Sequence, residues 1–296
     1  MSWIKTFSLI IVLTVLVILA GGAFGDMQGL IIAAIFAGLM NFIGFWFSDK
    51  LALTMAGAKP VTEKDEPRLH AMVADVARMA GLSKPRVYLI NNDSPNAFAT
   101  GRSPSHSVVA VTTGIRSLLS EDELRGVIAH EMAHIKNRDM LVMTTVAVLA
   151  GVIAFLATMA QWSLILGGGR RDSREGGNAL GIVALIATII LLPLMATLIR
   201  FAISRTREYA ADETGARIIS NPHALAAGLE KLGSFTSRKP MQATAANEAM
   251  AHMYIVNPLG AAEMHAKETG GGMVNLFSTH PPIQERVRRL RAMTLS

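Results

Sequence analysis

Four long stretches without a charged residue constrain this chain more than any other feature. A helix that crosses a bilayer needs about 20 consecutive, mostly apolar residues. A soluble chain of 296 residues rarely contains four such runs, so buried core helices are the weaker interpretation. We therefore predict four membrane spans: Thr6–Gly25, Met27–Ser48, Met140–Gly169 and Gly176–Ile199.

Composition supports contact with lipid and restricts the available chemistry. Only 17% of the residues are charged and 51% are hydrophobic, whereas an ordinary globular domain has roughly 25% charged residues. The chain has no cysteine, so disulfides and thiolate metal sites are excluded, and any metal must be held by His, Asp or Glu. The net charge of +6 is not gathered in one long basic run, which argues against a nucleic-acid partner and fits a nearby anionic membrane surface.

The lysines and arginines near the ends of the predicted spans set the orientation. One side has no Lys or Arg in the turn Gly21–Asp26 and three in the loop Arg170–Glu175. The other side has nine: Lys5, Lys50, Lys59, Arg125, Lys136, Arg138, Arg200, Arg205 and Arg207. We predict that this second side, with both termini and both large polar segments, faces the cytoplasm.

Periodicity and turn residues predict the elements of the polar segments. Pro67–Gly81 has the apolar spacing of a helix. Three short strands are predicted at Pro85–Ile90, Ala97–Thr100 and Val108–Thr113, and further helices at Asn221–Leu232 and Pro281–Met293. Ser120 and Glu123 have the spacing of a capping box, so another helix begins at Ser120. Gln242–Gly272 has little pattern and is expected to be a mobile lid or loop, and no role for it follows from the sequence.

The capped helix has the sequence His130-Glu131-Met132-Ala133-His134. Side chains four apart lie on one face of a helix, so the two imidazoles can share one tetrahedral metal ion. Glu131 lies beside them, where it can take a proton from the water that the metal activates. The alternative is a pair of solvent-facing histidines on an amphipathic helix.

A catalytic zinc needs a third protein ligand and an open fourth position. The longer motif with a glycine and a third histidine is absent, since Asn137 and Met140 stand at those places. Glu208 is the candidate, because the hairpin of the third and fourth spans returns the chain to the same side of the membrane. Asp212, one turn further on, can accept a hydrogen bond from a ligand histidine. The alternative is a surface pair that balances nearby arginines.

Together these features resemble the HtpX family of bacterial membrane-bound zinc endopeptidases, relatives of the CAAX prenyl proteases. The similarity also covers Asn96–Gly101 and Ser278–Pro282. It implies a mainly α integral membrane protein with four transmembrane helices and a zincin-like α+β catalytic domain carrying a small β-sheet. The expected parts are a transmembrane hairpin at 1–48, catalytic regions at 49–139 and 200–296, and a second transmembrane hairpin at 140–199.

The resemblance also implies a function. It predicts cleavage of misfolded or damaged membrane proteins at the cytoplasmic face of the bacterial inner membrane, as part of protein quality control under stress. It assigns one zinc per chain to His130, His134 and Glu208, and catalysis to Glu131. The expected partners are the lipid bilayer and protein substrates, with no nucleic acid.

Two further assignments come with the resemblance. The strand residues Asn96, Ala97, Phe98, Ala99 and Thr100 would line the cleft, where an extended substrate adds as a further strand; the alternative is a plain strand edge. His280 would stabilise the oxyanion of the reaction, or else cap a turn before Pro281. The other histidines have no partner pattern and are expected to be structural: His70, His106, His223, His252 and His265.

Two other classes of function are open to such a sequence. A membrane scaffold that keeps zinc structurally would need a closed site with four ligands, and only three candidates are evident. A transporter would have ionisable residues inside its spans, and the four uncharged stretches supply none.

Overall fold

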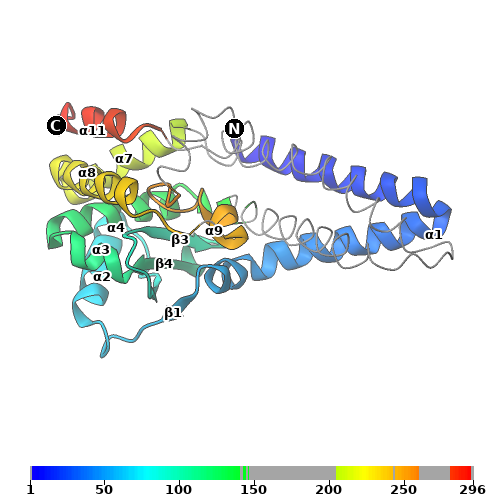
Figure 1. Ribbon diagram of the computed structural model, residues 1–296, viewed down its shortest axis with the longest axis horizontal. Helices are drawn as coiled ribbons and strands as arrows, with labels where there is room; N and C mark the ends of the chain where they lie inside the picture. Colours follow the sequence, from blue (N-terminus) through cyan, green and yellow to red (C-terminus); the bar gives the residue numbers. More distant parts are fainter. Residues whose placement is uncertain are drawn as a thin grey trace.

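The computed structural model describes residues 2–140, 143, 144, 146, 205–242, 244–259 and 281–294. The predicted fourth span, nearly all of the third span, His265 and His280 lie outside the described residues. A long helical hairpin extends from a body of helices and strands (Figure 1).

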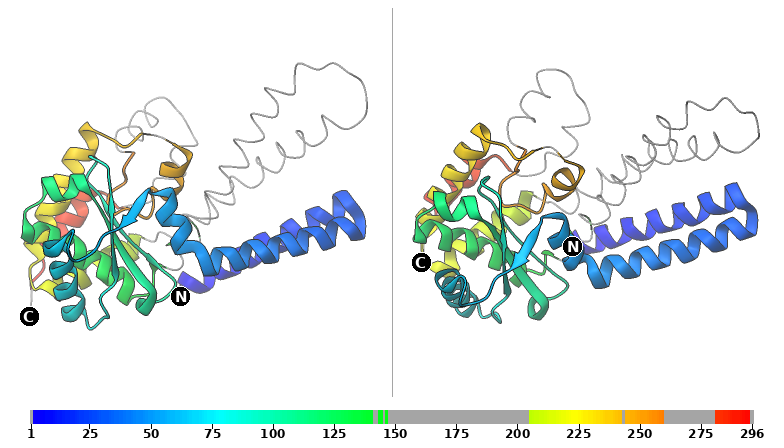
Figure 2. Two further views of the ribbon diagram at one scale, coloured as in Figure 1. Left: turned by 90° about the horizontal axis from the view of Figure 1, so that it is seen from below. Right: turned by 60° about the horizontal axis from the view of Figure 1, so that its bottom comes forward.

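The hairpin is α1 (Ser2–Met55), which doubles back on itself (Figures 1 and 2). The backbone at Asp26 has a φ of +51°, and the Asn41 side-chain amide donates a 3.0 Å hydrogen bond to the Thr14 hydroxyl across the two arms. The first two predicted spans are therefore the two arms of this hairpin. Among the residues that the structure describes, only the stretch Asp26–Ile43 is long and apolar enough to cross a membrane, so four spans are not confirmed.

The body contains a four-stranded mixed sheet of order β1-β2-β4-β3. Its strands are β1 (Ala58–Pro60), β2 (Arg86–Ile90), β3 (Ala97–Gly101) and β4 (Ser107–Thr112). β2 and β4 are parallel and the other neighbours are antiparallel. The three predicted strands are confirmed. β1 was not predicted, because three residues are too short to show an alternating pattern, and Pro60 is tolerated because β1 is an edge strand.

The helices of the body are α2 (Pro67–Ala80), α3 (Thr113–Leu118), α4 (Glu121–Lys136), α7 (Arg205–Ile219), α8 (Pro222–Arg238), α9 (Ala245–Met250) and α11 (Ile283–Arg291), with a 3₁₀ turn η1 (Pro104–His106). Thr113, predicted to end a strand, instead begins α3, because the Thr112 hydroxyl caps that helix by accepting from the Ile115 amide. The predicted capping box of α4 is present in both directions.

The two faces of the sheet serve two cores, as strand alternation requires. Val109 and Val111 face the main core, which α2, α4, α7 and α8 complete. Val108, Ala110 and Phe98 face a second core, formed with the end of α1 and the segment around α9. The sheet thus joins the hairpin to the helical body.

The segment Gln242–Gly272, which has little pattern, packs against β3 where the structure describes it. Met250, Tyr254 and Ile255 are buried, and Tyr254 meets the Phe98 ring edge-on. The Ile255 amide donates to the Ala97 carbonyl at 3.0 Å. Tertiary packing orders a stretch whose local sequence predicts no element.

Helices α4 and α7 approach each other closely at Gly215. A Cβ atom added there would lie 2.8 Å from the His130 backbone nitrogen. Only glycine fits at this distance without moving one of the helices. The contact therefore fixes how closely α7 packs on α4 at the level of His130.

We predict that Gly215→Ala lowers the thermal unfolding midpoint of the chain. The added methyl group overpacks the α4–α7 contact, which costs about 1–3 kcal/mol. Gly38→Ala is the matched control, because a Cβ there would meet nothing within 4 Å. An unfolding midpoint for Gly215→Ala equal to that of Gly38→Ala would show that the contact can open freely.

Candidate metal centre

The two motif histidines lie on the buried face of α4. The Nε2 atoms of His130 and His134 are 3.2 Å apart, and the two rings meet at 89°. One helical turn separates the two residues, which is why both rings reach the same point.

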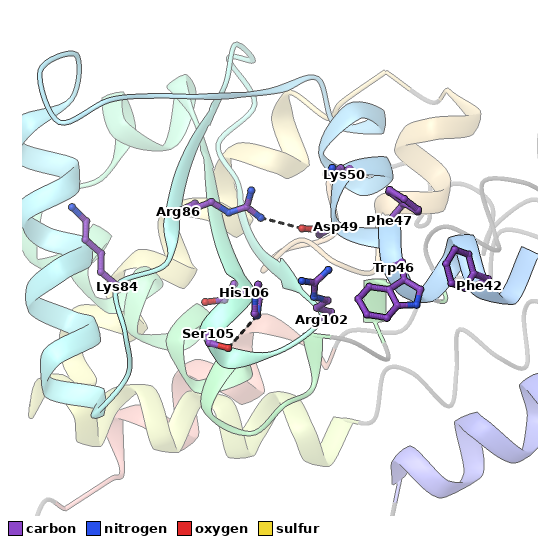
Figure 3. Close-up of a pocket in the computed structure, with 11 residues that line it drawn as sticks. Phe42, Trp46, Phe47, Asp49, Lys50, Lys84, Arg86, Arg102, Ser105 and His106 are labelled. Atoms are coloured by element: carbon purple, nitrogen blue, oxygen red, sulfur yellow. Dashed lines mark hydrogen bonds and ion pairs between the residues drawn. The ribbon is translucent and has the colours of Figure 1, made fainter.

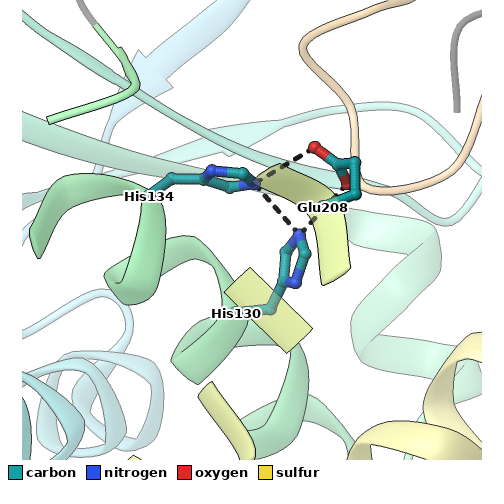
Figure 4. Close-up of side chains that lie close together, drawn as sticks. All are labelled: His130, His134 and Glu208. Carbon is teal, nitrogen blue, oxygen red and sulfur yellow. Dashed lines mark hydrogen bonds and ion pairs between the residues drawn. The ribbon is translucent and has the colours of Figure 1, made fainter. Parts of the chain in front are cut away.

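Glu208 reaches that point from α7. Its carboxylate oxygens lie 3.7 Å from His130 Nε2 and 3.4 Å from His134 Nε2. The three side chains offer ligand atoms within 4.8 Å of one another, and all three are buried (Figure 4). The structure thus brings together the three residues that the sequence predicts as metal ligands, although 74 positions separate His134 and Glu208.

Carboxylates hold the far side of each ring. Asp212 lies 2.9 Å from His130 Nδ1, as predicted, and Asp139 lies 3.3 Å from His134 Nδ1. A carboxylate is acceptor-only, so it favours the tautomer with the proton on Nδ1. Both Nε2 lone pairs then face Glu208 and are available to a metal ion.

The donor set fits a tetrahedral zinc ion. Ligand atoms at 2.0–2.1 Å from zinc are about 3.3 Å apart, close to the observed separations of 3.2, 3.4 and 3.7 Å. The charges also fit. Four carboxylates (Glu131, Asp139, Glu208 and Asp212) surround the site with two guanidinium groups (Arg207 and Arg286). A divalent cation balances the excess negative charge.

Arg286 is a buried part of the site that the sequence analysis missed. From α11 it donates to both oxygens of Asp212, at 2.8 and 2.7 Å, and to the Ile255 carbonyl at 2.8 Å. Burial raises the pKa of Asp212, but the adjacent Arg286 outweighs this and holds the pKa below its usual value. Asp212 therefore stays ionised and accepts from both Arg286 and His130.

A sequence signal for Arg286 does exist. Ile283, Arg286, Val287 and Leu290 have the i, i+3, i+4, i+7 spacing of a buried helix face. An arginine in place of an apolar residue on that face needs a buried anion as partner. The sequence alone does not say which anion, and Asp139, five residues after His134, has no comparable signal.

Glu131 is buried next to the ligands, and the Ala99 backbone amide of β3 faces its carboxylate. Burial raises the pKa of Glu131. This is the direction expected for a group that must accept a proton near neutral pH. The base candidate and the predicted substrate strand therefore lie next to each other.

Three other described histidines differ from this pair. His70 Nε2 lies 2.9 Å from the Val61 carbonyl and His252 Nε2 lies 3.0 Å from the Met143 carbonyl, so both link backbone segments. His106 is exposed and interacts with Ser103 and Ser105.

Comparison with known sequences decides between a peptidase and the two other classes of function. The profile of Peptidase family M48 matches residues 63–294. The chain belongs to peptidase family M48. This is a family of metallopeptidases, so the chain is a peptidase and not a zinc-bearing scaffold or a transporter.

Full-length relatives agree with the assignment. A "Protease HtpX homolog" of Syntrophobacter fumaroxidans is 49% identical over 292 residues, 99% of both chains. Proteins of the same name from Persephonella marina and Pyrococcus furiosus are 50% and 49% identical, and the matches cover 99% of this chain and 98% and 96% of theirs. The predicted resemblance is confirmed. The crystal structure of S. mikatae Ste24p aligns with a TM-score of 0.48 at 14% identity over 98% of this chain and 66% of that chain, too distant to add to the assignment.

We predict that the zinc affinity of the site formed by His130, His134 and Glu208 still changes with pH well above pH 7. Burial lowers the pKa of His134, but Asp139, Glu208 and Glu131 outweigh this and raise it to about 10. Below that pH a metal ion must displace the His134 proton, so its affinity falls about tenfold for each pH unit lowered. An ordinary histidine, with a pKa of about 6.5, would give a nearly constant affinity from pH 7 to 9.

The measurement is a competition titration of zinc against a chelator from pH 7 to 9. Asp139→Asn removes one group that raises the pKa of His134. The zinc affinity of this variant should therefore level off at a lower pH than that of the wild type. An affinity of the wild-type chain that stays constant over this range contradicts the prediction.

Proposed function

We propose that this M48 peptidase is a zinc-dependent endopeptidase anchored in a membrane, and that it cleaves misfolded or damaged membrane proteins at the cytoplasmic face of the bacterial inner membrane. One observation carries the proposal. His130, His134 and Glu208 converge within 4.8 Å while Glu131 lies buried beside them. The group is buried and anionic, as expected for a catalytic metal site.

In the proposed mechanism Glu131 moves the proton. Zinc, when bound, supplies a Lewis acid and lowers the pKa of water toward about 7. The Glu131 carboxylate takes a proton as the water oxygen bonds to the peptide carbonyl carbon, and returns it to the amine nitrogen as the C–N bond breaks. Asp212 and Asp139 keep the histidine rings oriented, and Arg286 keeps Asp212 ionised.

The proposed substrate position is the free edge of β3. A peptide that lies along Ala97–Gly101 would pass Glu131, since the Ala99 amide faces the Glu131 carboxylate. Two groups at the start of the strand are already engaged: the Ala97 carbonyl accepts from the Ile255 amide, and the Asn96 side-chain amide donates to the Val256 carbonyl at 2.7 Å. Since the Ala99 N–H faces Glu131, we propose that pairing begins at the Ala99 carbonyl and extends to Gly101. His280, just before Pro281, stays a candidate for stabilising the oxyanion.

The membrane anchor is proposed from α1 and the predicted hairpin 140–199. The Asp26–Ile43 arm carries exposed apolar side chains, such as Ile32 and Ile35, with 67% and 66% of their surface accessible. Such a surface is stable in lipid and costly in water. The excess of lysine and arginine beside the spans favours a catalytic region in the cytoplasm.

We predict that Glu131→Gln binds about one zinc per chain but loses at least about 100-fold in cleavage rate. The amide preserves shape and hydrogen bonding but cannot take the proton. The measurements are zinc content and cleavage of an unfolded membrane protein. Glu121→Gln is the matched control, because Glu121 lies on the same helix with an exposed side chain.

Two results for Glu131→Gln would contradict its role as the base. Full cleavage with zinc retained means that another group takes the proton. Loss of zinc together with cleavage would mean that Glu131 shapes the metal site instead of acting as the base. Reduced cleavage in Glu121→Gln would show that the assay reports on helix stability.

A further inference from the structure

A second site lies where α1 meets the sheet. A cavity of about 800 Å³ opens between the end of the hairpin and the loop after β3 (Figure 3). Its walls combine aromatic and cationic side chains: Phe42, Trp46, Phe47, Lys50, Arg86 and Arg102. None of these residues belongs to the metal centre.

The cavity carries excess positive charge. Arg86 is paired with Asp49 at 3.0 Å, and Lys84, also on the wall, is paired with Glu63 at 2.6 Å. Lys50 and Arg102 have no ion pair with any residue that the structure describes. Two cations therefore remain for an anionic ligand.

The aromatic wall continues the apolar surface of the hairpin. Phe42, Trp46 and Phe47 are 54%, 45% and 43% exposed and lie at or just beyond the end of the Asp26–Ile43 stretch. The Arg102 guanidinium lies 5.1 Å from the Trp46 ring, and the Lys50 ammonium lies 5.5 Å from the Phe47 ring. Tryptophan beside basic residues at the end of a span is typical of the membrane–water interface.

We propose that this cavity binds the phosphate headgroup of an anionic phospholipid, with the acyl chains along the exposed face of α1. The proposal rests on the membrane attachment in the proposed function. Lys50 and Arg102 would neutralise the phosphate, while Trp46 and Phe42 would contact the start of the acyl chains. A free phosphate ion would use the two cations but would gain nothing from the aromatic wall.

A bound headgroup would also act on the catalytic region. Arg102 directly follows Gly101, the last residue of β3, and the Ala99 amide of the same strand faces the Glu131 carboxylate. A lipid held by Arg102 would fix the height of this strand above the bilayer.

The test uses the full chain in a neutral detergent. The thermal unfolding midpoint is followed while dihexanoyl phosphatidylglycerol, dihexanoyl phosphatidylcholine or inorganic phosphate is added. We expect a saturable rise only with phosphatidylglycerol. The double variant Lys50→Gln/Arg102→Gln should need about 25-fold more lipid, since each cation near an anionic lipid contributes about fivefold in affinity. Lys64→Gln/Arg68→Gln, two exposed cations away from the cavity, should behave like the wild type.

Three results would overturn the site. They are an equal response of the Lys50→Gln/Arg102→Gln variant, an equal response to phosphatidylcholine, or the same rise with inorganic phosphate, which would make free phosphate the ligand. Flotation with neutral phosphatidylcholine vesicles separates the two proposals. If the chain does not float, both the membrane anchor and the lipid site are contradicted. If the chain floats but shows no specific response to phosphatidylglycerol, only the lipid site is contradicted.

Discussion

The close contact between α4 and α7 is the constraint on which the rest of the molecule depends. Gly215 lets the two helices touch at the level of His130, and this places Glu208 against both imidazoles. A wider spacing would move the Glu208 carboxylate away from the two imidazoles. The metal centre is therefore a property of helix packing and not of the motif on α4 alone.

A buried network of charges keeps this contact in one arrangement. Arg286 joins α11 to Asp212 on α7 and to the backbone of Ile255, while Asp212 holds His130 on α4. The loss of one partner would leave a buried charge uncompensated, which is far more costly than the loss of a surface ion pair. The same Ile255 bonds the start of β3, so the network also connects the metal centre to the strand beside Glu131.

The parts predictable from the sequence are those with local signals. The capping box, the valine-rich run of β4 and the spacing of His130 and His134 each follow from neighbouring residues. The prediction of Glu208 needed more than a local signal: the predicted hairpin that returns the chain to the same side, and the family resemblance. Asp139, Arg286 and the packing of Tyr254 on Phe98 depend on contacts between distant segments, for which a single sequence gives no register. The membrane anchor, α1 included, and the role of His280 stay predictions.

The most direct test of the central claim is X-ray absorption at the zinc edge on the full chain. Zinc in the wild type should show two imidazole nitrogens with oxygen ligands at about 2.0–2.1 Å. Glu208→Ala should lose an oxygen ligand and bind zinc more weakly, while Glu213→Ala, an exposed residue of the same helix, should leave the spectrum unchanged. An unchanged spectrum and affinity in Glu208→Ala would contradict a metal centre shared between α4 and α7.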